Sequence, residues 1–196
     1  MASNILAPGA KDKLLKLEHL LKKKHPKVIS SARNLSENIV LPATGTAAQC
    51  WNVIWDKPIW ANMKVEVASR NCQALRKWMP GAWRTWGCPG SDFVISRIGK
   101  GIRKESYVVQ GKLAKEILGE TGIARHRLFA IQGAAGALRA RRLRRHHPYA
   151  DLADIDLGEA VKILKAEMGP IWGPTTILHF LTDMGLAAKP DLHVVR

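Results

Sequence analysis

Apolar residues recur every three or four positions along most of this chain, and pairs of glycine and proline interrupt the recurrence. This spacing places apolar side chains on one stripe of an α-helix, which is typical of helices that pack one face on a core. The segments with this spacing are residues 11–24, 46–55, 68–79, 109–119 and 128–138, followed by two more near the C-terminus. Residues 85–105 show no clear period, so strand and helix both stay open there. The pattern predicts a mostly α-helical bundle.

The chain has 196 residues, enough for a core that needs no metal or disulfide. We therefore expect a single mainly helical domain over residues 1–196. The alternative is two lobes, a tryptophan-rich lobe at about residues 1–105 and a second lobe at 106–196 that contains a helix-hairpin-helix at 156–185 and a loop at 186–196. No Gly/Ser-rich linker separates the two.

Tryptophan is concentrated between residues 51 and 86. Trp83 and Trp86 lie there in a segment rich in glycine and proline, where an indole can stack on a displaced base. They are candidate residues of a base pocket. Packing in the core is the alternative.

The chain is strongly basic, with 31 lysines and arginines against 16 acids, a net charge of +15 and a pI of about 10.1. Such a charge favours DNA, because basic side chains that neutralise phosphates release counterions. Attraction to anionic lipid and simple solubility are the alternatives. No apolar stretch approaches the roughly 20 residues of a membrane span, so we expect no membrane partner.

Positive charge is densest just after the apolar stripe at residues 128–138. We expect this segment to contact phosphates, and a localisation tract or a solvated helix end is the alternative. Its arginines are Arg139, Arg141, Arg142, Arg144 and Arg145.

The sequence predicts neither a metal site nor a cofactor. Cys50, Cys72 and Cys88 lie far apart and form no C-x-x-C pair, so we expect buried thiols. Phosphate-cradling loops, nucleophile elbows and H-E-x-x-H pairs are missing from the sequence. The N-terminus lacks the series of a secretory signal, so we expect a cytoplasmic monomer, beside the nucleoid or, for a phage-encoded chain, in the host.

Two short helices with a tight turn between them are predicted near the C-terminus. Asp156 and Glu159 have the spacing of a capping box, and Gly169-Pro170 ends the apolar stripe that follows. Gly173-Pro174 begins the second helix, and Gly185 suits its left-handed end. A tight turn of this kind leaves backbone N–H groups at the start of the second helix, where they suit a phosphate.

Two segments resemble the helix-hairpin-helix DNA glycosylases, the family of endonuclease III and the alkyladenine glycosylases. The first is P-I-W-G-P-T-T at residues 170–176, where Gly173 and Thr176 match the hairpin's second glycine and threonine. The second is P-D-L-H-V-V-R at residues 190–196, which matches the loop of the family's essential aspartate. The resemblance implies that Asp191 is catalytic, that His193 lies near the base, and that the turn contacts DNA through Pro170, Ile171, Trp172, Gly173, Thr175 and Thr176.

The chain departs from the family at several positions. Thr175 stands where the bifunctional members carry a lysine, so we expect no lyase activity, and Ile171 replaces the first hairpin glycine. No cysteine follows Cys88, which excludes the family's C-terminal iron–sulfur cluster. Less than two turns of helix can follow Asp191, which predicts a truncated, permuted or divergent member.

Three functions follow as hypotheses. The first is a monofunctional DNA N-glycosylase that flips a damaged or modified base, with Asp191 stabilising positive charge on the sugar. The second is a phage-type enzyme that processes hypermodified thymines on the same fold. The third is a DNA-binding protein without catalysis that uses the hairpin to grip phosphates.

Overall fold

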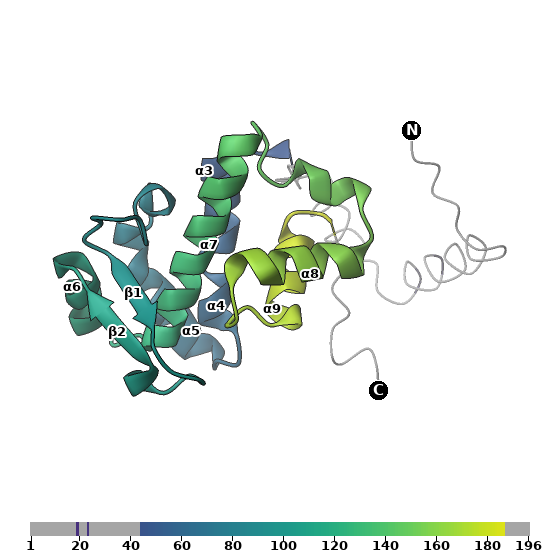
Figure 1. Ribbon diagram of the computed structural model, residues 1–196. Helices are drawn as coiled ribbons and strands as arrows, with labels where there is room; N and C mark the ends of the chain where they lie inside the picture. The colour runs from purple at the N-terminus through teal and green to yellow at the C-terminus, as the bar shows by residue number, and fades with distance from the viewer. Residues whose placement is uncertain (1–18, 20–22, 24–43, 187–196) are drawn as a thin grey trace. The chain divides into compact units, whose positions relative to one another are not determined.

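The computed structural model describes residues 44–186, together with His19 and Lys23. The chain divides into two units, residues 1–40 and 41–196, and the elements below belong to the second. They are α3 (Ala47–Ile54), α4 (Lys57–Trp60), α5 (Val65–Leu75), η2 (Arg76–Trp78), η3 (Ala82–Arg84), β1 (Val94–Arg97), η4 (Lys104–Ser106), β2 (Tyr107–Gln110), α6 (Lys112–Thr121), α7 (Arg125–Arg144), η5 (Ala150–Asp154), α8 (Leu157–Met168) and α9 (Pro174–Asp183). The fold is mostly helical, as predicted (Figure 1).

Helix α7 is the centre of this unit. It packs against α3, α4, α8, η3, β1 and β2. Its 20 residues make it about 30 Å long. Glycine lets α8 approach closely, because a Cβ at Gly133 would lie 2.2 Å from the carbonyl oxygen of Met168. Gln132 pairs with both backbone groups of Ile95, at 2.8 and 3.0 Å, and so fixes β1 to α7.

Local capping signals in the sequence define several helix ends. Thr46 accepts from the backbone N–H of Gln49, whose side chain accepts from the N–H of Thr46, a reciprocal capping box. The side chain of Asp156 caps α8 by accepting from the N–H groups of Gly158 and Glu159. α9 begins at Pro174, as predicted. The helix predicted at residues 11–24 falls almost wholly outside the described residues.

The stretch that stayed open in the sequence contains a strand of an antiparallel hairpin. β1 and β2 pair from Val94 opposite Gln110 to Arg97 opposite Tyr107. The helix predicted from Val109 therefore starts later, at Lys112. Gly111 separates the two elements with a φ of 87°, and a Cβ there would lie 2.1 Å from the carbonyl oxygen of Asp92.

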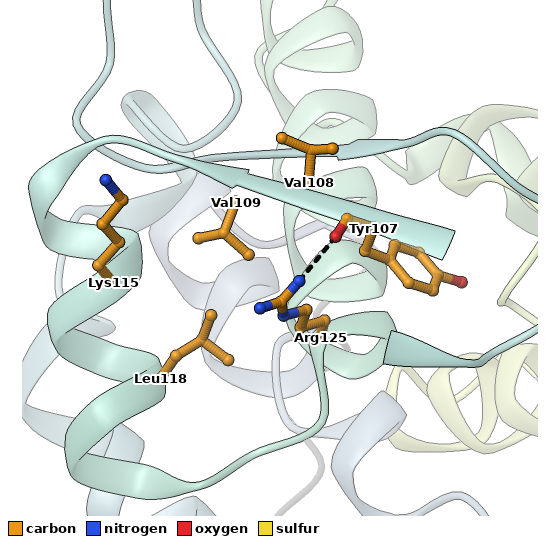
Figure 2. Close-up of a pocket in the computed structure, with 6 residues that line it drawn as sticks. All are labelled: Tyr107, Val108, Val109, Lys115, Leu118 and Arg125. Carbon is orange, nitrogen blue, oxygen red and sulfur yellow. Dashed lines mark hydrogen bonds between the residues drawn. The ribbon is translucent and has the colours of Figure 1, made fainter. Parts of the chain in front are cut away.

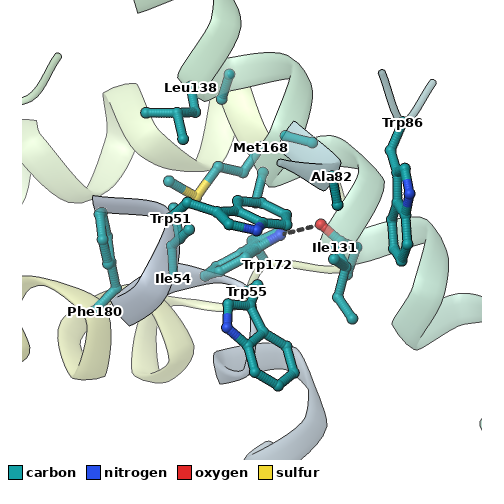
Figure 3. Close-up of a cluster of buried hydrophobic side chains, with 14 of the residues drawn as sticks. Trp51, Ile54, Trp55, Ala82, Trp86, Ile131, Leu138, Met168, Trp172 and Phe180 are labelled. Atoms are coloured by element: carbon teal, nitrogen blue, oxygen red, sulfur yellow. Dashed lines mark hydrogen bonds between the residues drawn. The ribbon is translucent and has the colours of Figure 1, made fainter. Parts of the chain in front are cut away.

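One apolar core runs through the described part of this unit (Figure 3). It contains residues from both proposed lobes, and the two strands pair across residue 105, so a lobe boundary there is wrong. Trp51 is buried, and its indole N–H donates to the carbonyl of Met79 at 2.8 Å. Within residues 44–186, no helix has both the length and the apolar character that a membrane crossing requires.

Candidate nucleic-acid interface

The α8–α9 turn, residues 169–173, is fixed to α7 by a buried tryptophan. The turn starts at Gly169, whose φ of 94° favours glycine. The side chain of Trp172 is fully buried, and its indole N–H donates to the carbonyl of Ala130 at 2.9 Å. The turn therefore holds a defined position against α7.

This burial corrects the expectation that Trp172 contacts DNA, because an indole needs an exposed face to stack on a base. Ile171 is half-buried and packs against the same core. The remaining predicted residues are accessible: Pro170 and Thr175 are exposed, and Gly173 and Thr176 are half-buried.

The start of α9 presents backbone donors at this turn. Gly173, the N-cap residue, has no side chain with which to cap the helix, and Pro174 follows as the first helical residue. The N–H of Ile177 donates to the carbonyl of Gly173 at 3.1 Å, the first such bond of the helix. The N–H groups of Thr175 and Thr176 precede it and have no helical carbonyl to bind. The helix dipole favours an anion at this position.

A cleft of about 670 Å³ opens beside these donors, and we call it the turn cleft. α9 and the turn form one side, and α4 with the residues after it forms the other. The lining residues are Lys57, Trp60, Ala61, Asn62, Ile171, Gly173, Thr175, Thr176 and His179. Trp60 is 37 % exposed, and its indole N–H donates to Oδ2 of Asp56 at 3.2 Å. The turn cleft thus places an aromatic ring, an amide and an imidazole near backbone N–H groups.

An arginine of α7 holds the α4 side of the turn cleft. The guanidinium of Arg127 donates to the carbonyls of Ile59 and Ala61, both at 2.9 Å, and to that of Pro58. Carbonyls at the end of a helix otherwise lack donors. Asn62 follows with a φ of 52°, a left-handed conformation that asparagine adopts more readily than most residues. This wall is therefore fixed by hydrogen bonds.

Lys57 lines the turn cleft as part of an ion-pair cluster. Its Nζ lies 3.2 Å from Oδ1 of Asp56 and also contacts Oδ2 of Asp183 in α9. Burial alone would lower the pKa of Lys57, but the charges and hydrogen bonds of these two carboxylates raise it above its ordinary value. The amine is therefore protonated at neutral pH, and it links α4 to α9.

Arg141, expected to contact phosphate, is a structural residue instead. Its side chain is buried, with Nε donating to Glu167 at 2.6 Å and Nη1 donating to Asp151 at 2.8 Å. Burial alone would lower the pKa of Arg141, but Glu167 and Asp151 raise it. The buried guanidinium is paired with these two carboxylates, so the prediction that Arg141 contacts a phosphate is wrong.

We call residues 139–145 the arginine segment. Its last three arginines are exposed, and they differ in whether an acidic side chain already pairs with them. Arg142 and Arg144 are exposed, and Nε of Arg144 donates within its own helix to Ala140. Arg145 is exposed but pairs with Asp151. Arg142 and Arg144 are the members of the segment most available to a phosphate.

The predicted tryptophan pocket is wrong for Trp86 and has no support at Trp83. Trp86 is 1 % exposed and stacks on Phe93 with ring centroids 3.7 Å apart. Trp83 is half-buried and packs against the core. Nη1 of Arg139 donates to the carbonyls of both tryptophans, at 2.7 and 2.8 Å, which gives this arginine a structural role beside the predicted DNA contact. Core packing explains the positions of Trp83 and Trp86, and Figure 3 shows Trp86 among the buried side chains.

Sequence reasoning did not single out Trp60, Asn62 or His179. The helix predicted at residues 46–55 ends before Pro58, and proline in the first turn is itself a signal that a helix starts. That signal would have predicted α4 and placed Trp60 and Asn62 at its end. His179 could not be found in this way, because the apolar spacing of α9 does not show that α4 lies on the other side of the turn cleft.

Asp191 and His193 lie outside the described residues. Within those residues, no group of three His, Cys, Asp or Glu side chains is placed to hold a metal. Burial raises the pKa of Cys50 to about 11. Burial and the charge of Asp56 raise that of Cys72 to about 11. Both thiols are therefore protonated at neutral pH.

Comparisons with protein-family models, with curated proteins and with solved structures each find no match to this chain. The resemblance to the glycosylases therefore depends on residues 170–176 and 190–196, and the described residues include only the first of these segments.

Proposed function

We propose that this chain binds DNA with the α8–α9 turn and, as a monofunctional DNA N-glycosylase, removes a base held in the turn cleft. The observation that carries the proposal is the position of the turn cleft. It opens where the N–H groups of Thr175 and Thr176 can hold a phosphate, and its volume of about 670 Å³ lies within the range of small-molecule sites.

The lining of the turn cleft suits a flipped base. The exposed face of Trp60 can stack on a base, which contributes about 1–3 kcal/mol in single-stranded complexes. Asn62 supplies an amide that both donates and accepts hydrogen bonds, and base edges are read by such groups. His179 lies on the opposite side.

Hydrolysis is assigned to Asp191. Breaking the base–sugar bond develops positive charge on the deoxyribose, and a carboxylate beside that sugar stabilises the transition state. Lys57, the lysine of the turn cleft, is held protonated by two carboxylates. A protonated amine cannot attack the sugar, which supports hydrolysis without lyase chemistry.

The proposal is tested by offering duplexes that contain varied lesions and phage-type modified thymines, and by measuring free base by chromatography. We expect one class to release its base, Asp191→Asn to abolish release without weakening binding, and Trp60→Ala to lower kcat/KM about ten- to hundredfold. Asp154→Asn is the matched control, because Asp154 is exposed in η5 and does not line the turn cleft. Release that survives in Asp191→Asn would contradict the assignment.

DNA binding without catalysis is the second candidate. The observation that favours it is that the backbone donors of α9 and the exposed Arg142 and Arg144 require no catalytic group to hold phosphates. Tight duplex binding with no base released from any substrate would establish this function instead.

A further inference from the structure

The loop between β1 and β2 presents two isoleucines to solvent. Ile98 is 69 % exposed and Ile102 is 62 % exposed. Large aliphatic side chains at such exposure, close together on one loop, are a feature of contact surfaces. We call residues 97–104 the basic loop.

Hydrogen bonds hold this loop in one conformation. The N–H of Ile98 donates to the carbonyl of Ser106 at 2.9 Å, and the hydroxyl of Ser106 donates to the carbonyl of Lys100 at 3.1 Å. The hydroxyl of Tyr107 donates to the carbonyl of Gly101 at 3.0 Å. Because the backbone is fixed by these bonds, the isoleucines are held outward rather than folded onto the core.

Basic side chains surround the two isoleucines. Lys100, Arg103 and Lys104 are exposed, and Arg97 is half-buried. The first acidic residue of the hairpin is Glu105, directly after the loop. The loop therefore combines an apolar tip with positive flanks, which complements a groove lined by phosphates.

The basic loop and the turn cleft are fixed to the same end of α7 by consecutive residues. Arg125 donates to the carbonyl of Tyr107 at 2.9 Å, as Figure 2 shows, and to that of Lys104 at 3.4 Å. His126 hydrogen-bonds the backbone of Ile102. Arg127 donates to the α4 wall of the turn cleft. Both features are therefore attached to the N-terminal end of α7.

We propose that the basic loop is a second DNA-binding surface, which inserts Ile98 and Ile102 between base steps of a duplex while Lys100, Arg103 and Lys104 contact the flanking phosphates. The inference rests on the proposed DNA binding, not on catalysis. Aliphatic wedges of this kind unstack base steps and kink the duplex. Two isoleucines make too small an apolar face to anchor a protein stably in lipid, which favours a duplex over a membrane.

The test uses an unmodified duplex with a donor and an acceptor fluorophore at its ends, and the full chain. We expect the wild type to raise energy transfer by bending the duplex. The double variant Ile98→Ser/Ile102→Ser should bind about tenfold more weakly and leave energy transfer unchanged. Leu157→Ser is the matched control, because Leu157 is a 40 % exposed aliphatic residue at the end of α8 remote from the turn, and it should bind and bend as the wild type does.

Two results overturn the inference. In one, the serine double variant binds and bends DNA as the wild type does. In the other, vesicles of phosphatidylserine bind the wild type but not the double variant, while duplex bending is the same for both, which would make the loop a lipid contact. Base release is measured separately, so a chain that bends duplexes without releasing any base contradicts the glycosylase proposal alone. A wild type that binds no duplex contradicts both.

Discussion

The arginine segment and the basic loop differ in how they use their positive charge. The arginine segment has five arginines, of which Arg139 holds carbonyls and Arg141 is buried against two carboxylates. The basic loop has four basic residues, three of them exposed and one half-buried. The arginine segment is the denser cluster in the sequence, yet more of its side chains form hydrogen bonds and ion pairs within the fold.

The reason lies in the position of α7. A central helix faces its neighbours on most sides, so an arginine on an inner face meets carbonyls and carboxylates before it meets solvent. A loop between two short strands has no such neighbours at its tip. Density of charge in the sequence is therefore a poor guide to which basic side chains face solvent, and the following experiments test that contrast.

The largest effect is expected for Arg141→Ala. Removal of the guanidinium leaves Glu167 partly buried without its partner and leaves Asp151 with Arg145 alone, which should lower the free energy of unfolding by about 3–5 kcal/mol. Arg142→Ala, one residue away and exposed, should change it by less than about 0.5 kcal/mol. Urea unfolding followed by tryptophan fluorescence measures both, and equal effects would contradict the structural role of Arg141.

Arg127→Ala extends the contrast to the other end of α7, where the partners are carbonyls. The change leaves the carbonyls of Ile59 and Ala61 without their donor, and we expect a loss of about 1–3 kcal/mol. Because Lys cannot reproduce the planar fork, Arg127→Lys should recover only part of it. Urea unfolding measures both variants. Full recovery in Arg127→Lys would mean that charge alone, without the fork geometry, holds the α4 wall.

These contacts also mark the limit of sequence reasoning. Helix ends were predictable at Thr46, Asp156 and Pro174 because capping residues act on the N–H groups next to them. The sequence left β1 open between strand and helix and assigned part of β2 to a helix, because the two strands are short and their pairing is not local. The fate of Arg141 was also unpredictable, since Glu167 lies on a different helix.

The candidate site also has one part that local sequence signals predict and one part that depends on distant residues. The turn and the start of α9 follow from glycine and proline within a few residues, so the sequence predicted them. The turn cleft needs a wall from α4, which the chain supplies far earlier, and α4 is positioned by Arg127. Nothing local to residues 170–176 indicates that wall.

Salt dependence of DNA binding compares the two basic regions directly. Lys100→Ala/Arg103→Ala and Arg142→Ala/Arg144→Ala should each lower the slope of log K against log salt by about 2, because each side chain gives up roughly one phosphate contact. Lys162→Ala is the control, since Lys162 is exposed and already pairs with Glu159 at 3.4 Å. Anisotropy of a labelled duplex over a salt series gives the slopes. A slope unchanged only in the arginine-segment variant would leave the basic loop as the main contact.

The smallest effect is expected from acid, and it concerns the carboxylate that occupies the arginine segment. Burial alone would raise the pKa of Asp151, but hydrogen bonds and charges from Arg145 and Arg141 lower it below its ordinary value. Because the folded state holds this pKa down, Asp151 stabilises the fold above the pKa of the unfolded chain, near 4, and that contribution is lost as pH falls through the folded value. We therefore expect the free energy of unfolding to fall more steeply below about pH 4 in the wild type than in Asp151→Asn. Urea unfolding at a series of pH values measures the two slopes, and parallel slopes would show that Arg141 and Arg145 do not hold Asp151 ionised, which would contradict the structural role of these two arginines.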